Sequence, residues 1–224
     1  MNIFTNKPRI DLSAVVDFDT DGALQETEAT ARRHSRRNFL RTSGVAVGGA
    51  VVAGGLLPGA SALAASTPKG DVAILNFALT LEYLESAFYA SAIKHAHLTG
   101  EVKRFAHTVH AHEAAHVAAL KKALGSAAVK RPTFDFGSAV TSQSAFQATA
   151  IVLEDTGVQA YQGQTPFIKS NAIFMAAISI HPVEARHAAW IRNLSGQSPA
   201  PAAFNPALTK DQVLAAVTGT GFIK

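Results

Sequence analysis

Glutamate and histidine recur along this chain at a spacing that suits the binding of metal ions. The segment His110-x-x-Glu113-x-x-His116 is matched later by His181-x-x-Glu184-x-x-His187. Residues three positions apart in a helix lie on the same side, so each Glu-x-x-His pair can offer an oxygen and a nitrogen to one ion. A single pair of this kind occurs by chance in many helices, and the second copy makes the pattern much more specific.

Each of these motifs follows a further glutamate by about thirty residues. Leu81-Glu82 is followed seven positions after the acid by Tyr89, and Leu153-Glu154 is followed at the same spacing by Tyr161. Glu113 lies 31 residues after Glu82, and Glu184 lies 30 residues after Glu154. One helical hairpin therefore occurs twice, which predicts six metal ligands: Glu82, Glu113, His116, Glu154, Glu184 and His187.

The apolar residues around these acids predict that they are buried. At 100° per residue, Glu113 and His116 share a stripe with Val109 and Leu120, and the other three acids lie on comparable apolar stripes. Burying one unpaired carboxylate costs roughly several kcal/mol. The charges of two divalent cations balance four carboxylates, and neutral imidazoles suit the remaining positions. We therefore expect two divalent metal ions with open positions for water or dioxygen.

Six further residues are predicted to lie beside the ligands: Glu85, Tyr89, His110, Asp155, Tyr161 and His181. Glu85 is the alternative to Glu82 as a ligand, and the repeat favours Glu82 because Gly157 stands where a second acid would be expected. The two histidines are 60° out of phase with the ligand stripe, which favours a supporting role or a helix contact. The two tyrosines are either hydrogen-bonding core residues, the favoured interpretation, or redox-active neighbours.

Three other side chains near the motifs have alternative interpretations. Asp155 turns about 100° away from Glu154 and is compatible with a partner for a ligand histidine. His112 and His116 are four positions apart and could chelate a single ion at the surface, although His112 lies off the apolar stripe. Arg186 is expected to pair with an acid on a neighbouring helix.

The elements that position these residues are predicted to be four long helices, over roughly 71–97, 101–124, 142–161 and 170–194. A short fifth helix is predicted over 209–217. Thr99 and Thr209 are expected to cap the second and fifth helices, Gly125 to end the second, and Pro182 to kink the fourth. Two short connections and one longer segment, 125–143, predict an all-α four-helix bundle with one long crossover between the second and third helices, the ferritin-type arrangement.

Residues 1–64 have the pattern of an export signal. Arg36-Arg37 followed by Asn38-Phe39-Leu40 resembles the twin-arginine motif, an uncharged run covers 42–58, and small residues suited to cleavage occupy 62–64. The uncharged run is too short and too rich in glycine for a membrane span, which takes ~20 apolar residues. We expect export through the twin-arginine translocation machinery to the periplasm or beyond the cell, and no stable membrane span in the mature chain. The alternatives are an uncleaved N-terminal anchor and a chance pair of arginines.

The remaining chain divides into a bundle domain, 65–196, and a tail with the short helix, 197–224. Residues 65–224 hold thirteen Lys and Arg against ten Asp and Glu without a dense basic stripe, so no nucleic-acid partner is expected. The chain has no cysteine, which excludes disulfides, thiolate metal sites and cysteine nucleophiles. A homodimer is compatible with the sequence.

The ordered motifs Glu, Glu-x-x-His, Glu, Glu-x-x-His resemble the ferritin-like superfamily, which includes ferritins, rubrerythrins and bacterial manganese catalases. The segments LNFALTLEYLE (75–85), LEDTGVQAY (153–161) and EARHAA (184–189) resemble, more narrowly, exported bacterial ferritin-like domain proteins, which are similar to plant desiccation-related proteins. The resemblance covers roughly 70–196 and 208–224 and matches all six ligand positions. It implies a pair of iron or manganese ions.

Two functions follow from this resemblance and the ligand set. The first is a di-iron or di-manganese oxidoreductase that protects against stress by oxidising Fe²⁺ or decomposing peroxide. The second is a non-catalytic envelope or desiccation-related stress protein with a structural or vestigial metal site. Iron storage in a cage is disfavoured, because the proline-rich segment 198–206 has no counterpart in cage-forming ferritins.

Overall fold

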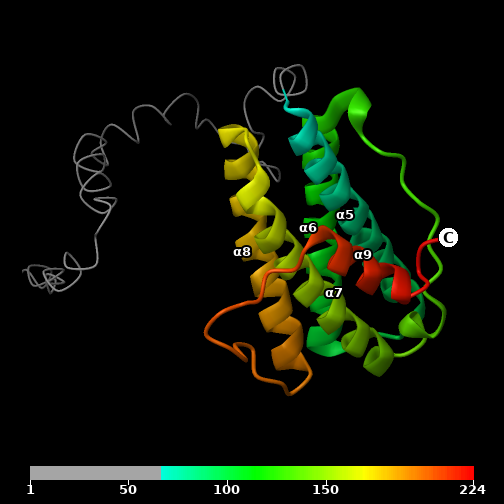
Figure 1. Cartoon of the computed structure of the whole chain (residues 1–224). Coiled ribbons are helices and arrows are strands. Elements are labelled where there is room, and N and C mark those ends of the chain that lie inside the picture. The colour runs from blue at the N-terminus through cyan, green and yellow to red at the C-terminus, as the bar shows by residue number, and fades with distance from the viewer. Residues whose placement is uncertain (1–66) are drawn as a thin grey trace, which may run out of the picture. The chain divides into compact units, whose positions relative to one another are not determined.

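The structure is a computed structural model that describes residues 67–224. The predicted export signal therefore lies outside the described residues. Five α-helices are present in this part of the chain: α5 (Lys69–His95), α6 (Gly100–Leu124), α7 (Gln143–Gln164), α8 (Asn171–Leu194) and α9 (Lys210–Gly219) (Figure 1). Three short 3-10 helices, η1 (Gly125–Ala127), η2 (Gly137–Val140) and η3 (Thr165–Phe167), lie in the connections. No helix within residues 67–224 combines the length and apolar character that a membrane span requires.

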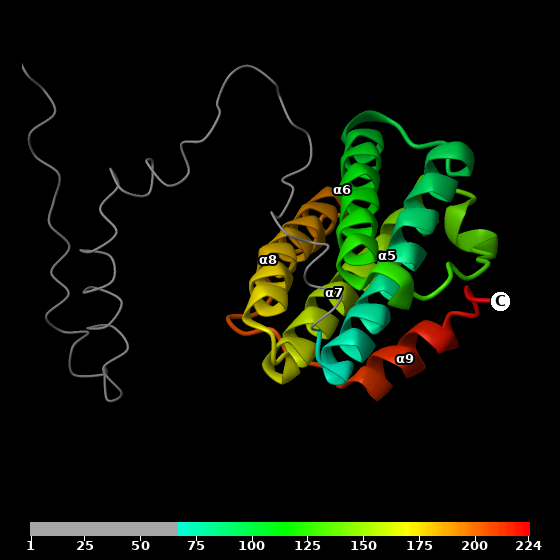
Figure 2. The same ribbon diagram turned by 90° about the horizontal axis from the view of Figure 1, so that it is seen from above.

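The four long helices form two hairpins that pack together. α5 packs mainly on α6, and α7 packs mainly on α8. The segment between α6 and α7 crosses from one hairpin to the other, and Figure 2 shows the four helices grouped around a common interior. The predicted all-α bundle with one long crossover is confirmed. Among the described residues the β-type pairing is limited to an isolated bridge between Phe134 and Ile223.

The helix ends show which local signals act as predicted. The Ser142 hydroxyl caps α7, and Thr209 begins α9 with a capping box. Gly125 ends α6 with a φ of 55°, a conformation that favours glycine. Thr99 stands at the start of α6 but its side chain makes no capping bond, so that prediction is wrong. The Thr99 hydroxyl instead donates to Gln143 Oε1 at 3.2 Å, on the other hairpin.

Two matching contacts tie the first turn of each hairpin to the bend of the other. Gln143 Oε1, at the start of α7, accepts a hydrogen bond of 2.9 Å from the Thr99 N–H in the connection between α5 and α6. Asp71, at the start of α5, accepts bonds of 2.8 Å and 3.0 Å from the N–H groups of Ser170 and Lys169, between α7 and α8. Asp71 is fully buried, so these donors supply the pairing that a buried carboxylate needs.

A core of aromatic side chains holds one end of the bundle together. Phe88 on α5 stacks on Phe146 on α7 with ring centroids 5.5 Å apart, and Phe105 on α6 packs against them. Val213 and Val217 join the same core from α9, which lies along the outside of the bundle (Figure 1). Each fully buried side chain of this size contributes about 1.5–3 kcal/mol. The core fixes the relative positions of the helices that carry the predicted ligands.

The crossover is anchored to the bundle on both sides. Asn76 on α5 donates to the Ala127 carbonyl at 2.9 Å and accepts from the Val129 N–H at 2.8 Å. The Asp135 N–H donates to the Phe222 carbonyl at 2.9 Å, next to the bridge described above. These bonds satisfy backbone groups of an irregular segment and hold it to α5 on one side and to the C-terminal segment on the other.

Candidate metal centre

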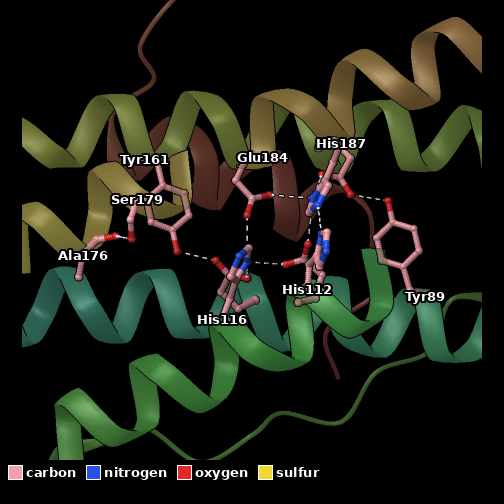
Figure 3. A network of polar contacts seen from close by, with 11 residues as sticks. Tyr89, His112, His116, Tyr161, Ala176, Ser179, Glu184 and His187 are labelled. Carbon is pink, nitrogen blue, oxygen red and sulfur yellow. Dashed lines mark hydrogen bonds and ion pairs between the residues drawn. The ribbon is translucent and has the colours of Figure 1, made fainter. Parts of the chain in front are cut away.

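Polar side chains from all four long helices converge in the middle of the bundle (Figure 3). The convergent residues are Glu82 on α5, Glu113 and His116 on α6, Glu154 on α7, and Glu184 and His187 on α8. The four carboxylates are only 0–1 % exposed. The six residues predicted from the repeat thus lie together, and we call them the metal cluster below.

The metal cluster consists of two overlapping groups of four residues. One contains Glu82, Glu113, His116 and Glu184, and the other contains Glu113, Glu154, Glu184 and His187. In each group, one potential ligand atom per residue lies within 4.8 Å of the others. Glu113 and Glu184 belong to both groups, so their carboxylates could bridge two ions.

The first group is arranged around the ring nitrogen of His116. Its Nδ1 atom lies 3.2 Å from Glu82 Oε2, 3.3 Å from Glu113 Oε2 and 3.1 Å from Glu184 Oε1. One ring nitrogen carries at most one proton and cannot serve three acceptors well. Neighbouring ligands of an octahedral ion with bonds of about 2.1 Å are about 3.0 Å apart. The observed spacing therefore fits atoms that surround a shared ion.

The second group repeats this arrangement around His187. Its Nδ1 atom lies 3.1 Å from Glu113 Oε1, 3.3 Å from Glu154 Oε2 and 3.8 Å from Glu184 Oε2. Glu113 and Glu184 each direct one oxygen to His116 and the other oxygen to His187. This is the arrangement expected of two carboxylates that bridge a pair of ions.

Several atoms of the metal cluster are buried without a hydrogen-bond partner. They are Glu113 Oε1, Glu154 Oε2, both carboxylate oxygens of Glu184, and His187 Nδ1. Leaving a buried polar group unpaired costs about 1–3 kcal/mol, and more when the group is charged. All five atoms are oxygen or imidazole nitrogen, which bind iron and manganese. The residues present therefore fit a metal site.

Two tyrosines hold the outer oxygens of two carboxylates. Tyr89 on α5 donates to Glu154 Oε1 on α7, and Tyr161 on α7 donates to Glu82 Oε1 on α5. Each tyrosine thus bonds to the acid of the other hairpin, and the two rings lie at opposite ends of the cluster in Figure 3. Burial and the adjacent carboxylates raise the pKa of both phenols well above the ordinary value, so both remain donors. Bonds of this kind orient metal-binding carboxylates.

Protons balance much of the negative charge when no cation is bound. Burial alone would lower the pKa of His187, but the carboxylates of Glu113, Glu154 and Glu184 beside its Nδ1 atom raise it to about 12. The pKa of His116 is raised in the same way, against the effect of burial. Burial would raise the pKa of Glu184, yet the two protonated imidazoles lower it to about 2. Metal ions binding here must therefore displace protons.

Glu85 is a fifth buried carboxyl group beside the metal cluster. It is 4 % exposed, and its Oε1 lies 3.3 Å from the position that a Cβ atom would take on Gly157. The same position lies 3.4 Å from Glu184 Oε2, so the glycine leaves space for both acids. Burial, followed by the charge of Glu154, raises the pKa of Glu85 well above the ordinary value, which favours the protonated acid. Glu82 belongs to one of the two ligand groups and Glu85 to neither.

His112 contacts the metal cluster although its phase along α6 lies off the ligand stripe. Its Nδ1 lies 2.8 Å from His187 Nε2, and the two rings stack with centroids 5.1 Å apart. This contact leaves His187 Nδ1 directed towards the carboxylates. Spacing within α6 could not reveal the contact, because the partner lies on α8. Burial and the two nearby histidines lower the pKa of His112.

Other predicted neighbours make different contacts. Asp155 pairs with Arg192 on α8 through two hydrogen bonds and not with a histidine. His110 Nδ1 and His181 Nε2 are buried without hydrogen-bond partners, so neither bonds to a cluster residue through that atom. Arg186 lines a pocket between α6 and α8, and the ion pairs found within residues 67–224 do not include it, contrary to prediction.

A comparison with known protein families agrees with this arrangement. A family model described as a ferritin-like domain matches residues 70–197, which is more than half of the chain. The matched segment contains the four long helices almost completely and includes every residue of the metal cluster. No curated protein matches the chain.

Proposed function

We propose a function from the premise that this chain belongs to the ferritin-like domain family. The protein binds two divalent ions of iron or manganese at the metal cluster and uses them in redox chemistry. The observation that carries this proposal is the convergence of four buried carboxylates and two imidazoles from four helices. Four buried anions without cations would be strongly destabilising, and two divalent ions carry the charge that balances them.

The two overlapping groups suggest how the ions would be held. One ion would be bound by Glu82 and His116, and the other by Glu154 and His187, with Glu113 and Glu184 shared between them. Bound iron or manganese would supply one-electron redox steps with dioxygen, peroxide or Fe²⁺, and Lewis acidity towards the oxygen atoms of peroxide or dioxygen. Six protein ligands leave positions on both ions for water or a substrate.

The surrounding residues have separate tasks in this proposal. Tyr89 and Tyr161 fix the orientation of one carboxylate each by donating to its outer oxygen. His112 orients the ring of His187. Glu85 holds a proton on a carboxyl group beside Glu184 and could pass it to a reacting oxygen.

Metal analysis tests the proposal directly. Protein purified from its own cells, or reconstituted without oxygen, is expected to contain about two iron or manganese ions per chain. Glu184→Ala should remove them, because Glu184 belongs to both groups. Glu101→Ala is the control, since Glu101 lies in the first turn of α6, outside both groups, and pairs with Arg104. Failure of the native protein to take up either metal would contradict the proposal.

A second candidate is a stress protein whose metal ions are structural. The observation that favours it is the nearly complete burial of the four carboxylates, which would also suit ions that never meet a substrate. This function predicts two bound ions that raise the melting temperature, as any ligand of the native state does, without turnover of hydrogen peroxide or of Fe²⁺ with oxygen. Turnover measured on metal-loaded protein therefore separates the two candidates.

We further propose that the protein is exported through the twin-arginine translocation machinery to the periplasm or beyond the cell. The support is the sequence pattern of residues 35–64. Arg36→Lys together with Arg37→Lys should retain the protein in the cytoplasm. The preceding pair, Arg32 and Arg33, provides a matched control, because its replacement by lysine should leave export unchanged. Equal export of both variants would contradict the proposed signal.

A further inference from the structure

A pocket between α6 and α8 leads to the histidine side of the metal cluster. It has a volume of about 490 Å³ and is lined by His116 and His187 of the metal cluster and, among others, by His112, Ala115 and Arg186. The side chains of His116 and His187 are 11 % and 3 % exposed, whereas the four carboxylates are 0–1 % exposed. A small molecule from solvent would therefore reach the cluster through its imidazoles.

The lining of this pocket disfavours cations. None of its seven residues is Asp or Glu, and Arg186 carries its one permanent charge. A hydrated divalent cation that enters here meets this positive charge, and the lining has no carboxylate to offset it. The three histidines of the lining carry no negative charge that would attract a cation, and the alanine, valine and tryptophan side chains offer no ligand. Fields in clefts of one sign change local ion concentrations and rates by about 10–10³-fold.

Another cavity near the cluster does not provide the same access. It has a volume of about 40 Å³ and reaches Tyr161 between Leu81 and Ile180, and its lining includes none of the six cluster residues. Because two of those six line the pocket between α6 and α8, this pocket is the better route to the proposed ions.

We infer, on the basis of the proposed function, that this pocket favours small uncharged or anionic oxidants of the peroxide class over Fe²⁺ as substrates once the two ions are bound. With hydrogen peroxide, one molecule loses two electrons and two protons to become O₂. A second molecule gains them and becomes two molecules of water, so that 2 H₂O₂ gives 2 H₂O and O₂. The reaction needs no further oxidant or reductant.

Blocking the pocket tests the route in the metal-loaded full-length protein, with azide as an anionic probe followed by absorbance. Ala115 is an exposed residue of the lining, and Ala115→Trp should slow azide binding and peroxide turnover by about tenfold or more while the metal content stays the same. Ala114→Trp is the matched control, because exposed Ala114 lies about 100° around α6 and outside the lining. Absence of azide binding in the native protein, or equal rates in both variants, would overturn the inference.

Reversing the charge of the pocket tests the discrimination against Fe²⁺. Arg186→Glu should weaken azide binding and speed the oxidation of Fe²⁺ by oxygen, each by about tenfold. Lys103→Glu makes the same change in net charge at an exposed position of α6 outside the pocket and should do neither. Native protein that oxidises Fe²⁺ as fast as it decomposes peroxide, or an Arg186→Glu variant identical to native in both assays, would contradict the inference.

Metal content keeps this test separate from that of the proposed function. Native protein that takes up no iron or manganese would refute the proposed metal centre and this inference with it. If the native protein binds two ions per chain but Ala115→Trp does not change the rate of azide binding, the pocket is not the route. The proposed metal centre would stand in that case.

Discussion

The hairpin formed by α5 and α6 and the hairpin formed by α7 and α8 carry the same ligands at equivalent positions, but they differ beside those ligands. Glu85 follows Glu82 by three residues, whereas Gly157 follows Glu154 by three. The Glu85 carboxyl group occupies the space that this glycine leaves. The equivalent positions thus define where the two proposed ions would bind, and the unequal ones would give those ions different surroundings.

A second difference lies on the pocket side of the cluster. His112 precedes Glu113, while Val183 precedes Glu184 in the other hairpin. His112 contacts the His187 ring, and both His112 and Val183 line the pocket between α6 and α8. Within the described part of the chain, His187 therefore has a histidine within hydrogen-bond distance of its ring nitrogen, and His116 has none. Chemistry at the two proposed ions need not be equal, although their ligand types are.

The largest predicted effect is on the amount of bound metal, and it should differ between the acids shared by both groups and the acids that belong to one group. Glu113→Ala and Glu184→Ala should each reduce bound metal from about two ions per chain to near zero, because both proposed ions lose a ligand. Glu82→Ala and Glu154→Ala should each leave about one ion. Metal analysis after gel filtration measures this, and anomalous scattering would locate the remaining ion. Loss of both ions from every variant would show that the two sites do not bind independently.

The next prediction concerns pH and the two histidines, one from each hairpin. In the metal-free protein, the raised pKa of His187, about 12 against 6.5 ordinarily, contributes stability that is complete below pH 6.5 and is lost as the pH rises towards 12. The raised pKa of His116 acts in the same direction. The free energy of unfolding should therefore fall between about pH 7 and pH 9, because this range lies above the ordinary histidine pKa of about 6.5. Apparent metal affinity should rise over the same range, because fewer protons compete.

Urea unfolding at several pH values measures the first trend, and metal titration measures the second. His116→Ala and His187→Ala should each flatten the stability profile of the metal-free protein if the hairpins are equivalent in this respect. A profile that stays as steep in one variant as in the native protein would assign the effect to the other hairpin.

A smaller effect is expected for the crossed tyrosines. Tyr89→Phe and Tyr161→Phe each remove the donor to one outer carboxylate oxygen and should lower the free energy of unfolding by about 1–3 kcal/mol. Metal affinity should fall by about 10–100-fold, as it does when partners of metal ligands are lost. Tyr83→Phe is the control, because the Tyr83 ring lies in an apolar cluster on the same helix. If the two variants lose different amounts of stability or metal affinity, the two hairpins are not equivalent in how their tyrosines support the carboxylates.

The smallest predicted effect concerns Glu85 and Gly157, the positions at which the two hairpins differ. Gly157→Ala should cost about 1 kcal/mol in the native background, because the new methyl group would press on Glu85, although alanine favours a helix over glycine by a similar amount. In a Glu85→Ala background the same change should stabilise the protein by about 0.5–1 kcal/mol. Denaturant unfolding of the four proteins in this cycle measures the sign. A stabilising effect in both backgrounds would show that Glu85 moves away freely.

The topology and the six cluster residues could be predicted because both depend on spacing along the chain. The repeat defines which positions are equivalent, the helical phase defines which side they lie on, and the loop lengths define which helices are neighbours. Glu113 and Glu184 were predictable on all three counts. The same spacing showed only that Gly157 stands where the repeat would place an acid. It could not show that the Glu85 carboxyl group fills the space beside that glycine.

Contacts between hairpins could not be predicted in this way. Tyr89 follows Glu82 by seven residues and lies on the same face, yet it bonds to Glu154 across the bundle. The Thr99 hydroxyl bonds to Gln143 instead of capping its own helix. The choice of partner depends on how far one hairpin is displaced along the other, and that displacement follows from packing of the whole core.

The glycine beside Glu85 also bears on how such a chain could have originated. An ancestral single hairpin that paired with a second copy of itself would carry the same residue at both positions. Two glutamates would then compete for the space that one occupies here, and two glycines would leave that space empty. In such a history, selection could place an acid on one side and a glycine on the other only after the gene for the hairpin was duplicated. The asymmetry of this pair would then date from after the duplication, whereas the shared Glu and His positions would be older.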